Sequence, residues 1–247
     1  MMATLQWATL MVCCAAVLLR VPDAVKGRNR TVFGILLLAT LCSLLAVSEI
    51  YGAIDGALGG RNFTSLIQRY LIFATVLLVG LRITRGLAAA KEHSLMAGGI
   101  GRCALALCCL AVAVTFFLMD TAGVPAGLQS PSGSGETDAE LAPYYIAAGR
   151  TYPVFVSLVL LPPLLAAVRS QLPRPVRVGA LLVFLGAVFA ILSFPVSLAP
   201  AGWADALRFV NYAAVLGYVG GLVAFWFSGL IGSPSGIGKE TFSQNGD

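Results

Sequence analysis

Eight polar side chains in the sequence could together form a binding site for a polar ligand or an ion. Guanidinium groups can bind an anion, carboxylates can bind a cation, and amide and phenol groups can donate or accept hydrogen bonds. The eight residues are Glu49, Asp55, Arg69, Tyr145, Arg150, Tyr152, Arg208 and Asn211. All of them lie within or beside strongly apolar segments, where a polar group needs a specific reason to be present.

Arg150 lies deepest in its segment and is the strongest candidate of the set. It stands about eight residues, or about 12 Å of helix, inside an apolar run. A charge at the centre of a membrane helix costs about 2.5–3.5 kcal/mol on insertion scales. We therefore expect Arg150 to face other helices and to find a carboxylate, water in a cavity, or the carbonyl of Gly149. That carbonyl loses its usual helical partner because Pro153 has no N–H.

All eight polar residues, Arg150 included, have a simpler alternative interpretation. Tyr, Trp and Arg commonly anchor helices at the level of the lipid headgroups. In either interpretation we predict that Glu49 and Arg69 pair across a hairpin over residues 53–65, with Gly59 and Gly60 forming its turn. Arg208 and Asn211 fall on one face of their helix, together with Tyr212 and Tyr218.

No set of residues indicates catalysis, a metal site or a cofactor. The sequence contains one histidine, His93, and offers no pair of nucleophile and base. The six cysteines all lie in apolar runs, where cysteine usually acts as a small apolar residue. A retinal protein needs a lysine in its last helix, and residues 206–230 contain none. We therefore predict a protein that is not an enzyme and that binds no nucleic acid.

The elements that position these residues are predicted to be membrane helices. The 247 residues are 58% hydrophobic and 11% charged, with a mean hydropathy of +0.89, whereas a soluble domain has about 25% charged residues. About 20 apolar helical residues cross a bilayer core, and no alternating strands occur. The sequence predicts an all-α bundle of seven transmembrane helices over residues 1–232, followed by a disordered cytoplasmic tail at 233–247. The spans lie near 3–20, 31–51, 66–85, 101–119, 142–168, 177–199 and 206–230.

The charges predict the orientation of the bundle. Twelve of the sixteen Lys and Arg residues fall in loops 1–2, 3–4 and 5–6 or in the tail, whereas seven of the eleven acidic residues fall on the opposite side. Short cytoplasmic loops hold the excess of Lys and Arg. We therefore expect an outside N-terminus, a cytoplasmic C-terminus and a basic inner face that meets anionic lipids of the plasma membrane.

Glycine and proline add local expectations. Gly217 and Gly221 have the spacing that lets two helices approach closely, and we expect them to pack within the bundle and not at a dimer seam. Pro153 and the Pro162-Pro163 pair are expected to interrupt and kink the fifth span. A loop over 122–140, rich in Gly, Ser and Pro, is expected to be flexible on the outer side.

Three stretches resemble a family of actinobacterial integral membrane proteins encoded near helix-turn-helix regulators and labelled as transporters. They are LLRVPDAVKGRNRT, AIDGALGGRNFTSLIQRYL and RVGALLVFLGAVFAIL. Asp55, one glycine (Gly59 or Gly60) and Asn62 match the family pattern before the third helix, whereas Arg61 stands in the place of its proline. Arg69 stands in the place of a histidine of that family, which removes a titrating group because arginine stays protonated. The resemblance implies a seven-helix membrane fold.

Two functions follow from these features. The first is a membrane sensor or accessory subunit that acts through a protein partner or through a second copy of itself. It is favoured by the short loops, the absence of an internal repeat and the basic inner face. The second is a transporter of a small solute or ion that uses the eight polar residues as a site in the outer leaflet.

Overall fold

The structure of the chain, a computed structural model, describes residues 2–25, 30–119, 136–199 and 201–227. Every regular element in these ranges is helical. The helices are α1 (Met2–Val25), α2 (Arg30–Leu44), α3 (Ser48–Ala57), α4 (Phe63–Gly86), α5 (Ala90–Ala97), α6 (Gly99–Leu118), α7 (Glu136–Arg169), α8 (Arg174–Ser197) and α9 (Ala204–Phe227), with a short 3-10 turn at Ala201–Trp203. The predicted tail at 233–247 lies outside the described ranges.

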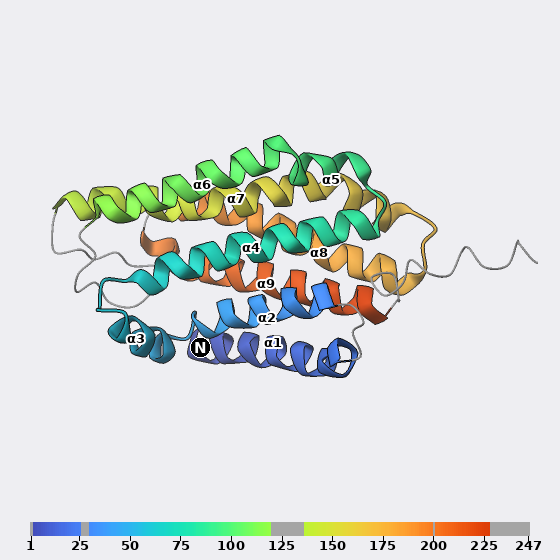
Figure 1. Cartoon of the computed structure of the whole chain (residues 1–247), viewed down its shortest axis with the longest axis horizontal. Helices are drawn as coiled ribbons and strands as arrows, with labels where there is room; N and C mark the ends of the chain where they lie inside the picture. Colours follow the sequence, from blue (N-terminus) through green and yellow to red (C-terminus); the bar gives the residue numbers. More distant parts are fainter. Residues whose placement is uncertain (1, 26–29, 120–135, 200, 228–247) are drawn as a thin grey trace, which may run out of the picture.

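The long helices run side by side along one axis, and α3 lies across one end of the bundle (Figure 1). Five of them are long and apolar enough to cross a membrane: Phe63–Gly86, Gly99–Leu118, Leu141–Arg169, Arg174–Ser197 and Ala204–Phe225. The all-helical prediction is thus confirmed for the described residues, and these five helices indicate a multi-pass membrane protein. In α1, the apolar segment Gln6–Pro22 is shorter.

The second predicted span, 31–51, is not one helix. α2 ends at Leu44, and the chain turns by 89° before α3 begins at Ser48. The residue before α3, Val47, is extended, with φ −80° and ψ 120°. Two polar residues explain the turn, because Tyr51 and Asp55 of α3 are both buried against the start of α4 and would lose these partners in a straight helix. Together the bent pair could form a sixth span.

The predicted turn at Gly59 and Gly60 is confirmed. Their φ angles are +97° and +68°, and that of Asn62 is +56°, which is the left-handed region that glycine and asparagine tolerate best. The predicted interruption of the fifth span is wrong, since α7 stays helical through Pro143, Pro153, Pro162 and Pro163. It also starts at Glu136, inside the predicted loop at 122–140. The rest of that loop, 122–135, is outside the described residues.

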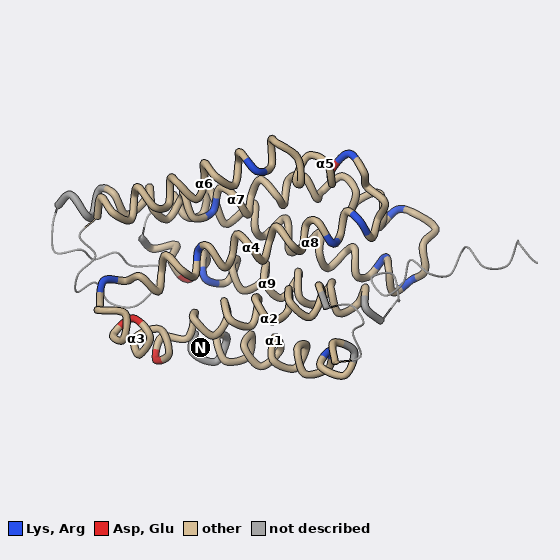
Figure 2. Tube along the Cα trace, in the orientation of Figure 1, with Lys and Arg blue, Asp and Glu red and all other residues tan. Residues whose placement is uncertain are grey.

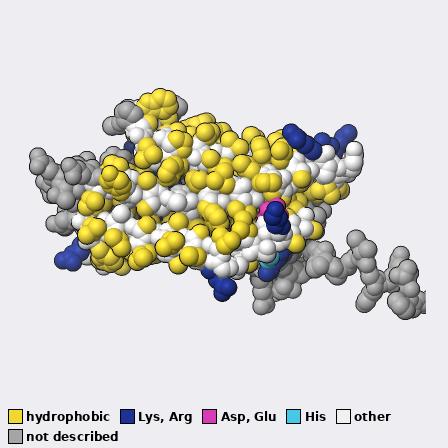
Figure 3. Space-filling view, turned by 90° about the horizontal axis from the view of Figure 1, so that it is seen from above, with side chains coloured by type: hydrophobic (Ala, Val, Ile, Leu, Met, Phe, Trp, Pro, Cys, Tyr) yellow, Lys and Arg dark blue, Asp and Glu magenta, His cyan; other side chains and the backbone are white. Residues whose placement is uncertain are grey.

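Apolar and charged residues are separated in the way that a membrane protein requires. One long face of the molecule is covered mainly by hydrophobic side chains (Figure 3). Most of the Lys and Arg residues that the structure describes gather at the end that carries α5, and acidic residues lie on α3 at the opposite end (Figure 2). These ends are called the α5 end and the α3 end below.

Glycines join α8 and α9 along their length. A Cβ atom at Gly217 would lie 2.7 Å from the Cα of Gly186, and one at Gly221 would lie 2.8 Å from the carbonyl oxygen of Gly179. Only a hydrogen in place of a side chain allows this approach. The prediction that Gly217 and Gly221 pack within the bundle is therefore confirmed.

Candidate functional site

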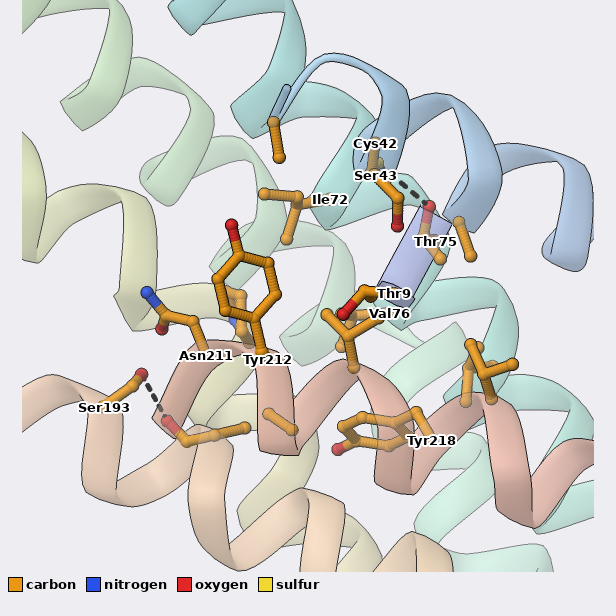
Figure 4. Close-up of a pocket in the computed structure, with 18 of the residues that line it drawn as sticks. Thr9, Cys42, Ser43, Ile72, Thr75, Val76, Ser193, Asn211, Tyr212 and Tyr218 are labelled. Atoms are coloured by element: carbon orange, nitrogen blue, oxygen red, sulfur yellow. Dashed lines mark hydrogen bonds between the residues drawn. The ribbon is translucent and has the colours of Figure 1, made fainter. Parts of the chain in front are cut away.

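A cavity of about 250 Å³ lies inside the bundle, between α1, α2, α4, α7, α8 and α9. Its wall is mainly apolar, but Arg69, Arg150 and Asn211 all border it. The polar side chains Thr9, Ser43, Thr75, Ser193, Tyr212 and Tyr218 also line it, and Figure 4 shows them around the space between the helices. This cavity is the candidate site, because predicted site residues from three separate helices meet there.

Arg150 forms one hydrogen bond across the bundle. Its Nη1 donates to the Oδ1 of Asn211 on α9 at 2.8 Å. The partner is thus a side-chain amide, and neither a carboxylate nor a backbone carbonyl. The Nε of Arg150 is buried and has no hydrogen-bond partner. The charge of this guanidinium therefore remains uncompensated by any described carboxylate.

Arg69 projects from α4 onto α7. Its guanidinium lies over the ring of Tyr145, with the Cζ atom 4.0 Å from the ring centre, an arrangement that attracts a cation to the aromatic face. Beside it, the Nη1 of Arg69 occupies the space that a side chain at position 149 would fill, so the absence of a Cβ in Gly149 gives the guanidinium its place. The side chain is only 4% exposed, and its Nε has no hydrogen-bond partner.

Gln68 completes the polar end of the cavity. Its Nε2 donates to the carbonyl oxygen of Cys42 on α2 at 3.2 Å. Its Oε1 is buried without a partner. Tyr145, which supports Arg69, is held by a hydrogen bond of its own, because its hydroxyl lies 2.9 Å from the Oγ of Ser65. The site thus presents two guanidinium groups, of which Arg69 lies on a tyrosine that is itself hydrogen-bonded.

The predicted pair of Glu49 and Arg69 is wrong. Glu49 lies on the exposed side of α3, where its carboxylate accepts a hydrogen bond from the Oγ of Ser48 at 3.3 Å. Arg69 is buried against Tyr145 and Gly149 instead. The pairing rested on a straight second span, and the turn after Leu44 carries Glu49 away from α4.

Asp55 has a structural role at the α3 end. Its carboxylate accepts hydrogen bonds from the backbone N–H groups of Asn62, at 3.1 Å, and of Thr64, at 3.3 Å. Tyr51 adds a bond from its hydroxyl to the Oδ1 of Asn62 at 3.0 Å. A carboxylate in this position satisfies the free N–H groups at the start of α4 and interacts favourably with the helix dipole.

Replacing Asp55 with alanine should therefore destabilise the protein by about 1–3 kcal/mol, because two buried N–H groups lose their acceptor. Thermal unfolding of the purified protein in detergent measures this loss. The matched control is Asp205→Ala, since the side chain of Asp205 is 76% exposed and lies 3.6 Å from Arg208 on the surface of the same helix. An Asp55→Ala protein as stable as the control would contradict the assigned role.

Two further predicted site residues also lie outside the cavity. Arg208 is partly exposed and is 3.6 Å from Asp205, one helical turn away. Tyr152 is fully buried between Phe73 and Phe155, with ring centres at 5.4 and 6.1 Å, and its hydroxyl has no hydrogen-bond partner. Of the eight predicted residues, the cavity thus brings together Arg69, Arg150 and Asn211, with Tyr145 supporting Arg69.

The sequence prediction did not include Gln68, Gly149, Ser43 or Thr9 as site residues. Gln68 carried a usable signal, because an uncharged amide beside Arg69 in an apolar run also needs a buried partner. For Gly149 the sequence pointed to its carbonyl as a partner of Arg150, and gave no signal that its missing Cβ makes room for Arg69. The two hydroxyl residues are common in membrane helices and carried no signal.

The site contains no arrangement for metal binding or disulfide chemistry in the part of the chain that is described. No group of three or more His, Cys, Asp or Glu residues there could hold a metal ion. The six cysteines are free, as their apolar setting predicts. Cys13 and Cys42 instead contact hydroxyl groups, Cys13 at 3.5 Å from the Oγ of Ser43 and Cys42 at 3.9 Å from the Oγ1 of Thr75.

Comparisons of the chain with protein-family models, with curated proteins and with solved structures found no match. The resemblance to the actinobacterial membrane family stays a prediction.

Proposed function

We propose that this multi-pass membrane protein binds a small organic anion in the cavity between α4, α7 and α9. One observation carries the proposal: Arg69 and Arg150 both border the cavity, and neither has a carboxylate partner among the described side chains. A buried ion without a partner costs several kcal/mol. An anionic ligand would compensate both charges, and the two guanidinium forks suit a carboxylate or phosphate group.

The activity that this site supports best is sensing. The anion would bind in the half of the bundle near the α3 end, and the basic α5 end would pass the signal to a protein partner or a second copy of the chain. Residues of six helices line the site, so that a bound anion would change how these helices pack. In this proposal the protein is not an enzyme, and it lies in the plasma membrane in contact with anionic lipids.

Transport is the second candidate, and a feature of α7 favours it. Pro153 borders the cavity one turn from Arg150, and Pro162 and Pro163 follow in the same helix. Proline weakens the helical hydrogen-bond ladder at these points and eases bending of α7. Uptake of labelled benzoate by the purified protein in liposomes would identify a carrier, and binding without uptake would identify a sensor.

Three probes of similar shape test anion binding: benzoate, neutral benzyl alcohol and cationic benzylammonium. A ligand that binds only the native state stabilises it by RT ln(1 + [L]/Kd) and thereby raises the melting temperature. We expect benzoate to stabilise the protein in detergent, and the other two probes to have no effect. Equal stabilisation by benzoate and benzyl alcohol would contradict the proposal.

The variant Arg150→Leu should bind benzoate at least tenfold more weakly, yet its melting temperature without ligand should equal or exceed that of the parent protein. Removing a buried charge gains several kcal/mol, whereas leaving Asn211 without its partner costs about 1–3 kcal/mol. Arg150→Lys keeps the charge but not the planar fork, and it should also bind more weakly. Arg208→Leu is the matched control outside the cavity and should bind normally. Normal benzoate binding by Arg150→Leu would refute the site.

We also propose seven spans, with α1 and the bent pair of α2 and α3 added to the five long helices, an outside N-terminus and a cytoplasmic C-terminus. The concentration of Lys and Arg at the α5 end supports this orientation. In a cysteine-free background, a single cysteine at position 130 should react with an impermeant reagent in intact cells. Cysteines at 93 and 240 should react only after permeabilisation, and labelling of position 93 in intact cells would reverse the orientation.

A further inference from the structure

We infer that the ligand is a single-chain amphiphile, with an anionic head between Arg69 and Arg150 and an apolar tail directed toward the α5 end. This inference rests on the proposed anion site and specifies the rest of the molecule bound there. It follows from the way in which polar and apolar groups are distributed along the cavity.

The cavity is polar near the α3 end and apolar farther along. Along α4, its wall runs from Arg69 to Val79, ten residues or about 15 Å of helix. Along α9, it runs in the same direction from Asn211 to Leu222, eleven residues or about 16 Å. Ile35 and Val219 also lie at the far end. Two helices thus place the charged groups at one end and branched aliphatic groups at the other.

The unsatisfied polar atoms follow the same division. Near the α3 end, the Nε atoms of Arg69 and Arg150 and the Oε1 of Gln68 are buried without partners. Farther along, the protein satisfies its own polar groups, because Thr75 donates to the carbonyl oxygen of Leu71 at 2.7 Å and the Tyr218 hydroxyl bonds the Oγ of Ser157 at 2.8 Å. Only the first region therefore needs a polar ligand group, and the second offers an apolar surface.

The size of the cavity limits the tail to one chain. Pockets for drug-sized ligands measure about 300–1,000 Å³, and this cavity of about 250 Å³ is smaller. A medium-chain fatty acid, or an alkyl phosphate of similar length, matches the length, the volume and the distribution of polarity. A two-chain phospholipid does not match this volume.

Binding of radiolabelled decanoate to the purified chain in nanodiscs of neutral lipid tests the inference, with empty nanodiscs correcting for partition into lipid. Decanol, acetate and decyl phosphate serve as competitors. Decanol lacks the charge and acetate lacks the tail, so each should compete at least tenfold less well than unlabelled decanoate. Competition by decyl phosphate equal to or better than that of decanoate is also expected if the head is a phosphate, and it supports the same class of ligand.

Two variants separate the head from the tail. Val219→Phe fills the apolar end and should weaken decanoate at least tenfold while leaving acetate competition for labelled benzoate unchanged. Val79→Phe fills the same apolar end from α4 and should have the same effect on decanoate. This variant is used if the Val219→Phe protein fails to fold. Arg150→Leu should weaken decanoate and acetate alike.

The outcomes distinguish this inference from the proposed function. If acetate competes as well as decanoate, or if both phenylalanine variants bind decanoate normally, the amphiphile is refuted while the anion site stands. If decanol competes as well as decanoate, and if Arg150→Leu binds decanoate and acetate normally, the amphiphile and the anion site are refuted together.

Discussion

Replacing Gly217 with alanine should lower the free energy of unfolding by at least about 1–3 kcal/mol, because the new methyl group forces α8 away from α9. The new Cβ would lie 2.7 Å from the Cα and 2.8 Å from the backbone nitrogen of Gly186, and 2.9 Å from the carbonyl oxygen of Leu182. All three are backbone atoms of α8, which no change of rotamer can move. The two helices must therefore separate at a contact that includes both Gly186 and Gly179 of α8.

Gly220 provides the matched control on the same helix. A Cβ at this position meets only the Cδ1 atom of Leu182, at an ordinary distance of 3.7 Å. Alanine is about 1 kcal/mol more favourable than glycine inside a helix, so Gly220→Ala should leave the melting temperature unchanged or raise it. Thermal unfolding of both variants in the same detergent compares them, and equal melting temperatures would mean that α8 and α9 do not meet at Gly186 and Gly217.

Replacing Gly149 with alanine should remove Arg69 from the binding site while leaving both arginines in the protein. The Cβ would overlap the guanidinium and come within 2.9 Å of the Cδ of Arg69. Arg69 must then leave the face of Tyr145, and the cavity retains only one correctly placed guanidinium. We expect at least tenfold weaker binding of benzoate, which is about 1.4 kcal/mol, and a lower melting temperature.

The control for this change is Gly34→Ala, at a helical glycine whose Cβ would meet nothing within 4 Å. This variant should bind normally and should be at least as stable as the parent. The double variant Gly149→Ala with Arg69→Leu separates the two effects. It should recover stability, because the clash is gone, and should still bind weakly. Normal binding by Gly149→Ala would show that Arg69 does not contact the ligand.

The sequence by itself was sufficient for the membrane class, the helical content and the separation of charge. These properties depend on composition and on neighbouring residues: a chain with 11% charged residues cannot form a water-exposed surface, and a helix satisfies its backbone within one segment. The turn at Gly59 and Gly60 and the glycine pair Gly217 and Gly221 were predictable for the same reason, since each depends on a local need for a missing Cβ.

The sequence also selected Arg150, through its depth in an apolar run. The sequence did not indicate which residue forms the hydrogen bond with Arg150. Asn211 is 61 positions away on α9, and the rotation of each helix about its own axis determines whether the two meet. In a soluble helix an apolar stripe shows that rotation. Here the faces toward lipid and toward other helices are both apolar, so that periodicity carries little information.

Only the tertiary structure decided which polar residues form one site. It placed Arg69 against Gly149 and Tyr145, assigned Asp55 to the start of α4, and left Glu49 and Arg208 outside the cavity. The turn between α2 and α3 caused two of these differences, the placements of Glu49 and Asp55. A hydrophobic run extends through Leu45, Ala46 and Val47 without a break, yet the helix ends at Leu44, because contacts of Tyr51 and Asp55 with residues 62–64 stabilise α3 across the bundle. These contacts connect residues of different helices, and they stabilise the chain only after the helices have packed. The hydrophobic pattern of one segment therefore cannot predict them.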